Sequence, residues 1–486
     1  MSEASALAGL EPALIWKRFG ELTLIARPSK EEKAAREHVL AWASARSLAS
    51  SVDAEGNVVV PVPASAGRER APTVVLQSHL DMVCERDPDC PYDPREGRIN
   101  VVVDGDWVLA DGTTLGADNG IGVAAAMAVT DESEIAHGPL ELLFTVSEEQ
   151  GLDGAKALDP SLVSGRLLIN LDGTSDDAVT VGCAGSAHSF VRAQLELEPP
   201  RPDHVTLEVV LSGAKGGHSG GDIASGRVNA IKALGRILAR SFEQEPFQLA
   251  RLGGGVSRNA IPREARAAVS LEPDAEPAFR AAAEQELAAL REQYTGFDDE
   301  LTLWVERIAE VGATSERATA RVLDLVAMIP TGVIAMSPAL PGTVETSTSL
   351  TVASTDEGTL TLASMTRSSN ARALEDVVAT IAAATRLATA SIEVVRSYPP
   401  WRPDLESRLL TVSKATFQRL FGVEPVLAVV HGGLECAVIG TKLPNVEMIS
   451  IGPEIVGPHA PGERLSISGT QRFYSLLGAL LDDLSR

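Results

Sequence analysis

The sequence predicts an α/β protein: a mostly parallel sheet flanked by helices, interrupted by an inserted α+β domain. In the first part of the chain short apolar segments alternate with helical patterns, an order typical of parallel sheets. Several of these segments run directly into acidic or imidazole side chains. In a parallel sheet ligands bind at the carboxyl ends of the strands, so these side chains fall where a site is expected. After Cys183 the pattern changes to alternating strands and long helices, which marks the insertion.

The expected elements of residues 1–183 follow from local patterns. An amphipathic stretch within 10–28 predicts a helix, and Ser29 with Glu32 three residues later forms a capping box for a second helix. The elements expected next are a turn and strand at 53–61, a buried strand at 74–77, a hairpin at 101–109, an alanine-rich helix ending near 129, and buried strands at 140–146 and 167–171.

His79 and Asp81 follow the buried strand at 74–77. The alternation of a strand places both side chains on the same side. A carboxylate beside a histidine can fix the tautomer of a metal-binding imidazole. An ordinary surface histidine fits this pattern as well, so the pair alone leaves both interpretations open.

Carboxylates recur at the other predicted strand and helix ends. Asp118 lies among glycines where the alanine-rich helix begins, so it can be either a functional carboxylate or a helix N-cap. Glu148 and Glu149 follow the strand at 140–146, and Asp172 follows the strand at 167–171. In a parallel sheet these side chains share one edge, which makes a common site plausible.

The chain divides into three parts by pattern: residues 1–183 begin the first domain, residues 184–399 form the insertion, and residues 400–486 complete the first domain. Within the insertion, an order of strand, helix, two strands and helix recurs after roughly 90 residues. This recurrence predicts an insertion of two lobes. From Trp401 onward, a helix at 405–420, strands at 426–430 and 446–451, and a last helix at 468–484 are expected.

Composition excludes several classes of function. The formal net charge of −24 over 486 residues argues against nucleic-acid and anionic-membrane partners. The four cysteines form no C-x-x-C pair, which suits a reducing cytoplasm. The first residues lack the pattern of a signal peptide, and the most apolar helix is too short to span a bilayer. We therefore expect a cytoplasmic protein.

Six motifs in sequence order carry a resemblance to a known family. They are His79-Leu80-Asp81-Met82-Val83, Gly116-Ala117-Asp118-Asn119-Gly120, Ser147-Glu148-Glu149, Asn170-Leu171-Asp172, Gly217-His218-Ser219-Gly220 and His431-Gly432-Gly433-Leu434-Glu435-Cys436. With them the chain resembles the aminoacyl-histidine dipeptidases (peptidase D or cytosol non-specific dipeptidases) from about Pro28 to its C-terminus. These are dinuclear zinc exopeptidases related to carboxypeptidase G-type enzymes and aminoacylases. The resemblance implies a zinc-exopeptidase-like catalytic domain with an inserted lid domain.

The resemblance implies a metal-binding role for five residues. His79 and Asp172 would bind one metal ion, Glu149 and His459 would bind the other, and Asp118 would bridge the two. The implied cofactor is two Zn²⁺ per subunit, although oxygen and imidazole ligands also accept Mn²⁺ or Co²⁺.

Catalytic roles follow from the same resemblance. Asp81 would hold His79, and Glu148 would act as general base on a water that bridges the metals. The peptide bond after Asp118 is expected to be cis, as in relatives. His218 would stabilise the oxyanion, either within its own chain or from a second subunit.

Substrate-binding residues are also implied. Asn259, Arg367 and Gly433 would hold the substrate, with Arg367 on its carboxylate, which a planar guanidinium can bind with two hydrogen bonds. Without the resemblance, Arg367 fits an ordinary surface arginine in a salt bridge.

Small departures from the family pattern lie next to implied ligands. Gln77 and Ser78 precede His79 where relatives often have glycine, and Gly173 follows Asp172 where serine is common. They leave the metal ligands unchanged.

Together with the resemblance, these observations predict a metal-dependent dipeptidase that hydrolyses Xaa-His, such as β-alanyl-histidine, and other short dipeptides. The resemblance also implies a homodimer. One alternative is a deacylase of N-acyl amino acids or a carboxypeptidase with the same fold. A second alternative, from another class, is a non-catalytic metal-dependent binding protein. The base Glu148 argues against the second, because metal binding alone does not need a base.

Overall fold

The computed structural model describes residues 6–486. They form two compact units. Unit 1 comprises the chain up to Gly182, together with Trp401–Val430 and Leu434–Arg486. Unit 2 comprises Cys183–Pro400 and the short segment His431–Gly433. Unit 2 is thus mainly a long insertion within the sequence of unit 1.

Unit 1 is built on an eight-stranded sheet with the strand order β1-β2-β6-β3-β7-β21-β8-β20. Its strands are β1 (Ser51–Val52), β2 (Val58–Val62), β3 (Val74–His79), β6 (Leu140–Thr145), β7 (Leu167–Asn170), β8 (Ala178–Cys183), β20 (Val426–Val430) and β21 (Glu447–Ser450). The residues of β3, β6 and β7 are all buried, as expected for central strands covered on both faces.

The sheet of unit 1 is mixed, whereas the sequence predicts a mostly parallel one. Strand β3 pairs in parallel with β6 and β7, and β7 pairs in parallel with β21. The pairs β1–β2, β2–β6 and β8–β21 are antiparallel. The tight turn between β1 and β2 brings the chain straight back, which only an antiparallel pair allows. The parallel centre is the part that carries the predicted site.

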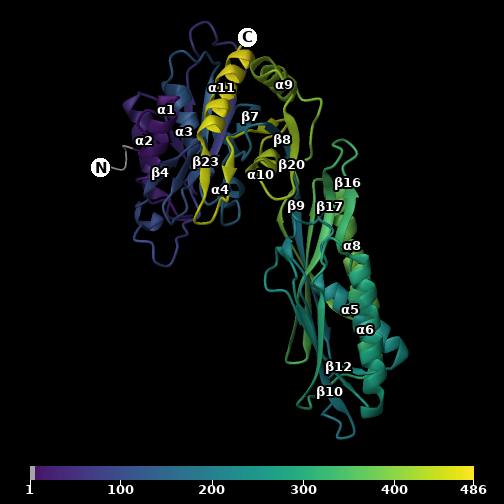
Figure 1. Cartoon of the computed structure of the whole chain (residues 1–486). Helices are drawn as coiled ribbons and strands as arrows, with labels where there is room; N and C mark the ends of the chain where they lie inside the picture. The colour runs from purple at the N-terminus through teal and green to yellow at the C-terminus, as the bar shows by residue number, and fades with distance from the viewer. Residues whose placement is uncertain (1–5) are drawn as a thin grey trace. The chain divides into compact units, whose positions relative to one another are not determined.

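Helices cover this sheet and a smaller one completes unit 1. The helices are α1 (Ala13–Leu22), α2 (Lys33–Ala45), α3 (Ala117–Asp131), α4 (Asp153–Ala157), α9 (Arg408–Phe421), α10 (Glu435–Lys442) and α11 (Ile467–Leu484). The small sheet has the order β22 (Ile455–Val456), β23 (Arg464–Ser466), β5 (Trp107–Ala110) and β4 (Val101–Asp104). Helix α3 packs against both α1 and β3, and Figure 1 shows α3 beside α1. Its buried alanines permit this close approach.

The predicted capping box is wrong. Helix α2 begins at Lys33, and the residue before it, Glu32, makes no side-chain cap. The Glu32 carboxylate instead accepts hydrogen bonds from the backbone N–H groups of Lys30 (2.8 Å) and Ser147 (2.9 Å). The Ser29 hydroxyl donates to Asp81 (2.7 Å). Both side chains are used by partners distant in sequence, which outcompete the local cap.

Unit 2 contains an antiparallel nine-stranded sheet with the order β15-β10-β14-β12-β17-β18-β9-β19 and with β16 paired to β17. The strands are β9 (Gly185–Gln194), β10 (Val205–Ser212), β12 (Gln248–Gly254), β14 (Ala265–Leu271), β15 (Thr302–Ile308), β16 (Gly332–Met336), β17 (Val344–Asp356), β18 (Thr359–Ser368) and β19 (Ser391–Tyr398). A separate pair is formed by β11 (Gly217–His218) and β13 (Ala260–Ile261). The two series of elements that the sequence predicts as lobes both contribute to the nine-stranded sheet, where β12 pairs with β17.

Four helices pack along one face of this sheet, each in contact with a neighbouring helix (Figure 1). They are α5 (Ala230–Gln244), α6 (Glu276–Gln293), α7 (Glu316–Met328) and α8 (Ala371–Leu387). The core between helices and sheet is aliphatic, with a few aromatic rings such as the edge-on pair Phe247 and Phe279.

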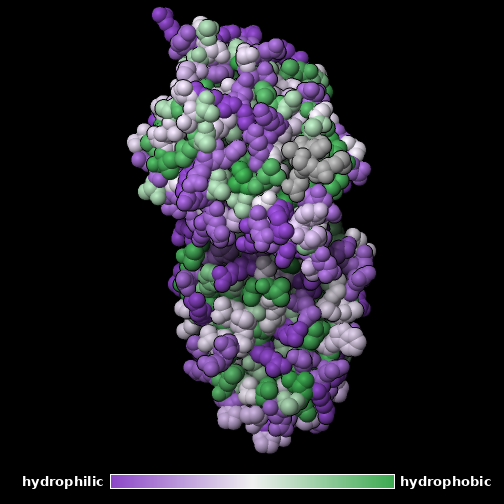
Figure 2. Space-filling view, turned by 90° about the vertical axis from the view of Figure 1, so that its left-hand side faces the viewer, coloured by the Kyte–Doolittle hydropathy of each residue, from purple (hydrophilic) through white to green (hydrophobic). Residues whose placement is uncertain are grey.

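On the face shown in Figure 2, hydrophobic residues lie in small groups among hydrophilic ones. Within residues 6–486, none of the helices is both long and apolar enough to cross a membrane.

Candidate active site

The carboxyl ends of the central strands in unit 1 bring the predicted ligands together. His79 ends β3, Glu148 and Glu149 follow β6, and Asp172 follows β7. Asp118 lies in the first turn of α3, and His459 lies between β22 and β23. These residues form three groups, in each of which the ligand atoms lie within 4.8 Å of one another. The groups are His79–Asp118–Asp172, Asp118–Glu149–His459 and His79–Glu148–Glu149.

Asp118 lies between the two histidines and directs one oxygen at each. Its Oδ1 is 3.0 Å from His79 Nε2, and its Oδ2 is 3.4 Å from His459 Nε2. Asp172 Oδ1 lies 3.5 Å from His79 Nε2, and Glu149 Oε2 lies 3.0 Å from His459 Nε2. The peptide bond after Asp118 is cis, as predicted. Asp118 therefore belongs to two groups, the one with His79 and Asp172 and the one with Glu149 and His459.

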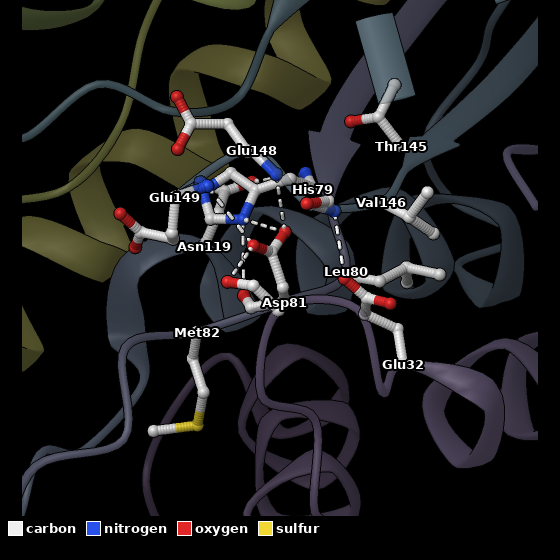
Figure 3. A network of polar contacts seen from close by, with 12 residues as sticks. Glu32, His79, Leu80, Asp81, Met82, Asn119, Thr145, Val146, Glu148 and Glu149 are labelled. Atoms are coloured by element: carbon white, nitrogen blue, oxygen red, sulfur yellow. Dashed lines mark hydrogen bonds and ion pairs between the residues drawn. The ribbon is translucent and has the colours of Figure 1, made fainter. Parts of the chain in front are cut away.

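Asp81 holds the side chain of His79 and the loop that carries the two glutamates. Its Oδ1 lies 3.2 Å from His79 Nδ1 and accepts the backbone N–H of Glu148 (3.0 Å). Its Oδ2 accepts the backbone N–H of Glu149 (3.1 Å) and the hydroxyl of Ser29 (2.7 Å). Figure 3 shows this network, with the side chains of Glu148 and Glu149 pointing away from Asp81. Asp81 thus fixes three site residues without joining any of the three ligand groups.

Two positions beside the site adopt left-handed backbone conformations, which are uncommon for residues other than glycine. They are Ser147, which precedes Glu148 (φ 52°), and His459 (φ 68°). Backbone strain of this kind concentrates at functional sites, where the surroundings enforce it.

The electrostatics of the cluster show an excess of negative charge. Burial, together with the charge of Asp118, raises the pKa of Asp172 to about 8. Burial also raises the pKa of Glu148 well above its usual range. Burial acts to lower the pKa of His79, but Asp172 and Asp118 outweigh it and raise that pKa well above the ordinary value. Hydrogen bonds to Asp118 and Glu149 raise the pKa of His459 to about 10.

These observations fit divalent cations. Clustered carboxylates repel one another unless positive charge lies among them. Glu149 Oε1 is buried and has no hydrogen-bond partner among the described residues, which leaves it available as a ligand atom. Imidazole nitrogens and carboxylate oxygens are a donor set that zinc, manganese and cobalt accept. Of the described residues, those that could hold such ions are His79, Asp118, Glu148, Glu149, Asp172 and His459.

A layer of buried polar side chains lies next to the proposed ligands, two residues earlier along the chain in β3 and β7. Gln77, two residues before His79, donates to Glu435 Oε2 (2.6 Å) and accepts from Asn170 (2.7 Å), two residues before Asp172. Thr145 also donates to Glu435 (2.6 Å). Burial raises the pKa of Glu435 to about 7. This layer links the ends of β3, β6 and β7, and it gives Gln77, a departure from the family pattern, a structural role.

A second departure, Gly173, has a steric reason. A Cβ at Gly173 would lie 2.5 Å from the backbone nitrogen of Gly452, and a Cβ at Gly452 would overlap the carbonyl oxygen of Gly173. The two backbones can therefore approach this closely only because both residues are glycine.

In unit 2, the pairing of β11 with β13 brings His218 and Asn259 together. His218 pairs with Ala260, and the N–H of Ser219 donates to the carbonyl of Asn259 (2.7 Å). The N–H of Gly221 donates to His218 Nδ1 (3.0 Å). Partial burial and the charge of Arg367 lower the pKa of His218, which favours the neutral ring. Because Nδ1 accepts, the ring hydrogen of the neutral form lies on Nε2.

Arg367, in β18, faces this histidine. It is only 5% exposed, and its buried Nε has no hydrogen-bond partner among the described residues. Its Nη1 donates to the hydroxyl of Tyr398 (3.3 Å), and its Nη2 lies 3.5 Å from His218 Nε2. Both groups at that last contact are donors, so an acceptor shared between them would satisfy both. Gly433 packs against the ring of Tyr398, where a Cβ would lie 2.7 Å from a ring carbon.

The sequence-based interpretation missed several residues that support these groups: Arg27, Ser29, Tyr398, Glu435 and Glu463. Glu435 lies in a quoted motif, and Glu463 lies four residues after His459, so their proximity to motif residues was an available signal. Ser29 and Arg27 had no such signal, because their partners are more than 50 residues away.

Comparison with known proteins identifies the family. A family model described as Peptidase family M20/M25/M40 matches residues 75–483. The chain belongs to this peptidase family. It is 35% identical over 481 residues to the cytosol non-specific dipeptidase of Escherichia coli K12, covering 99% of each chain. The crystal structure of aminoacylhistidine dipeptidase from Vibrio alginolyticus matches with a TM-score of 0.92 and 34% identity, again over 99% of each chain.

A more distant structure shows the fold alone. Aminopeptidase PepT from Bacillus cereus has a TM-score of 0.57 at 17% identity, covering 98% of this chain and 100% of its own. The predicted α/β class, the resemblance to aminoacyl-histidine dipeptidases and the peptidase class are therefore confirmed.

Proposed function

We propose that this metal-dependent dipeptidase uses two zinc ions to hydrolyse Xaa-His and other short dipeptides. The observation that carries the proposal is the pair of ligand groups that share Asp118. His79 and Asp172 would hold one ion, Glu149 and His459 the other, and Asp118 both. The chemistry that ions held there would supply is a lower pKa for a bound water and a polarised scissile carbonyl.

Glu148 is the proposed general base. Its backbone is held by Asp81, and its carboxylate is free of that network and lies within the reach of His79 and Glu149. Burial raises the pKa of Glu148 above its usual range, which makes the carboxylate a stronger proton acceptor. Glu148 takes a proton from the attacking water and delivers it to the leaving amine.

Arg367 and His218 are proposed to bind the anionic oxygens of the substrate and of its tetrahedral intermediate. A buried guanidinium is stable only with partners, and the hydrogen-bond partners of Arg367 among the described residues, Tyr398 and His218, are not anions. A substrate carboxylate supplies an anionic partner in a planar arrangement that arginine matches. His218 would donate a hydrogen bond from Nε2 to the anionic oxygen of the tetrahedral intermediate. Asn259 and Gly433 complete the proposed substrate-binding set.

Dipeptides are the proposed substrates because the relatives that match over the full chain are named as dipeptidases. The name of the Escherichia coli relative also supports a cytoplasmic location. A homodimer is proposed on the family resemblance, and light scattering of the purified protein tests it. A deacylase of N-acyl amino acids remains the alternative with the same site.

The proposed function is tested by histidine release from β-alanyl-histidine with purified, zinc-loaded protein. A panel of dipeptides and N-acetyl amino acids is assayed in parallel. Dipeptide turnover that a chelator abolishes supports the proposal. Turnover of acylated amino acids alone would instead favour the deacylase as the function of this site.

The role of the base is tested by Glu148→Gln, with the exposed Glu134→Gln as matched control. The first variant is expected to bind zinc and lose turnover by about 10²–10⁴-fold. Full turnover in Glu148→Gln would remove the proposed mechanism.

A further inference from the structure

Arg27 is a buried cation whose partners are backbone carbonyls. It lies between α1 and α2 and is 1% exposed. Its Nη1 donates to the carbonyl oxygens of Leu80 (3.1 Å) and Asp81 (2.9 Å), and its Nη2 donates to that of Gly116. It therefore connects the segment after His79 to the segment before Asp118.

Glu463 binds the same segment before Asp118 through its backbone N–H groups, whereas Arg27 binds a carbonyl oxygen. Glu463 is 1% exposed. Its Oε2 accepts the N–H groups of Leu115 (2.8 Å) and Gly116 (2.9 Å), and its Oε1 accepts those of Ala117 (2.8 Å) and Asp118 (3.3 Å). Successive N–H groups converge on one anion when a left-handed residue interrupts the turn, and Gly116 supplies it with φ of 70°.

The two charges act on one loop. Gly116 donates its N–H to Glu463 and offers its carbonyl to Arg27. A Cβ at Gly116 would lie 2.5 Å from Arg27 Nη2 and 2.6 Å from Met82 Sδ, so the guanidinium lies directly against the loop backbone. Buried charges are destabilising unless hydrogen bonds satisfy them, and here backbone groups of the ligand loops supply those bonds.

This placement connects the parts that carry the proposed ligands. Glu463 follows His459 by four residues, so its bonds tie the loop of His459 to that of Asp118. Arg27 ties the loop of Asp118 to the end of β3, which carries His79. Neither Arg27 nor Glu463 belongs to any of the three ligand groups.

We propose that Arg27 and Glu463 are positioning residues, which hold Asp118, His79 and His459 in a metal-ready arrangement before any ion binds. The inference rests on the proposed ligand assignment. It predicts that loss of either residue weakens metal binding beyond its effect on folding, because the ligands must then be ordered when the ion binds.

Zinc affinity of the full chain, measured by competition with a chromogenic chelator, tests this role. Glu463→Gln keeps the size of the side chain but has one acceptor oxygen, so two of four backbone N–H groups lose their partner. Glu141→Gln is the matched control, since Glu141 is a buried glutamate of unit 1 that accepts the N–H groups of Ser164 (3.0 Å) and Gly165 (3.0 Å), away from the ligand loops. Both metal-free variants are expected to unfold at lower temperature than the wild type.

Glu463→Gln is expected to bind zinc about 10- to 100-fold more weakly, while Glu141→Gln stays within about twofold of the wild type. Arg27→Met should weaken zinc binding as much as Glu463→Gln does. Arg27→Lys should weaken it less, because an ammonium keeps the positive charge but lacks the paired donors of the planar guanidinium. Unchanged affinity in Glu463→Gln, with the same thermal destabilisation as Glu141→Gln, would overturn the proposal. A wild type that binds no zinc would remove the ligand assignment as well.

Amide hydrogen exchange of the zinc-free wild type gives a second measurement that needs no variant. The N–H groups of residues 115–118 are expected to be protected before zinc is added. Protection that appears only with zinc would show that the loop is ordered by the ion, and it would overturn the proposal.

Discussion

Replacing Asp81 with asparagine is expected to weaken zinc binding by about 10- to 100-fold, although Asp81 is not a proposed ligand. The carboxylate has four hydrogen-bond contacts: His79, Ser29 and the backbone N–H groups of Glu148 and Glu149. Hydrogen bonds from His79 and Ser29, with the charge of His79, outweigh burial and lower the pKa of Asp81 to about 2. It is therefore ionised at neutral pH.

The magnitude follows from these contacts. Asparagine has one acceptor oxygen, which can replace the Oδ1 that faces His79 and Glu148. Its amide nitrogen then faces the N–H of Glu149, while the Ser29 hydroxyl can turn to accept. One buried N–H group left without a partner is destabilising by about 1–3 kcal/mol. A tenfold change in affinity corresponds to about 1.4 kcal/mol, so this range agrees with the expected loss.

The assay is competition for zinc between the purified protein and a chromogenic chelator. Asp104→Asn serves as control, because Asp104 is an exposed aspartate in the same unit. Ser29→Ala, which removes one of the four contacts, should have a smaller effect. An Asp81→Asn variant with affinity within about twofold of the wild type would show that these contacts do not support the ligands.

Three further outcomes are expected. Arg367→Met should raise the activation free energy for dipeptide hydrolysis by about 2–5 kcal/mol and so lower kcat/KM, because the substrate carboxylate loses its cationic partner; steady-state kinetics would contradict this if dipeptides with a free carboxylate stayed favoured over their C-terminal amides. Gly452→Ala should destabilise unit 1 by about 1–3 kcal/mol, because its Cβ meets Gly173, and denaturant unfolding measures the change. Zinc at 100 times its dissociation constant should stabilise the fold by about 2.7 kcal/mol, and an unchanged melting temperature after chelation would refute this.

Local patterns in the sequence predicted many individual elements correctly. Strand β3, the hairpin of β4 and β5, and helix α3 lie where the apolar periodicity and turn residues place them. These features depend on neighbouring residues, which the sequence displays directly. The roles of the proposed metal ligands came instead from the resemblance to the aminoacyl-histidine dipeptidases.

Other features depend on residues far apart in the chain. The antiparallel outer strands of the unit 1 sheet were missed, because apolar runs do not state the direction of a neighbour. Ser29 has the local pattern of a helix cap, yet its hydroxyl bonds to Asp81, 52 residues away.

The sequence by itself therefore determined the α/β class, the family and the identities of the candidate ligands. Only the tertiary structure decided how those ligands are held. Buried polar groups must find hydrogen-bond partners wherever the fold places them. Glu463 finds its partners near Asp118, more than 340 residues earlier, and Glu435 finds Gln77 and Thr145. No local pattern encodes such pairs, because they form only when the strands and loops have packed.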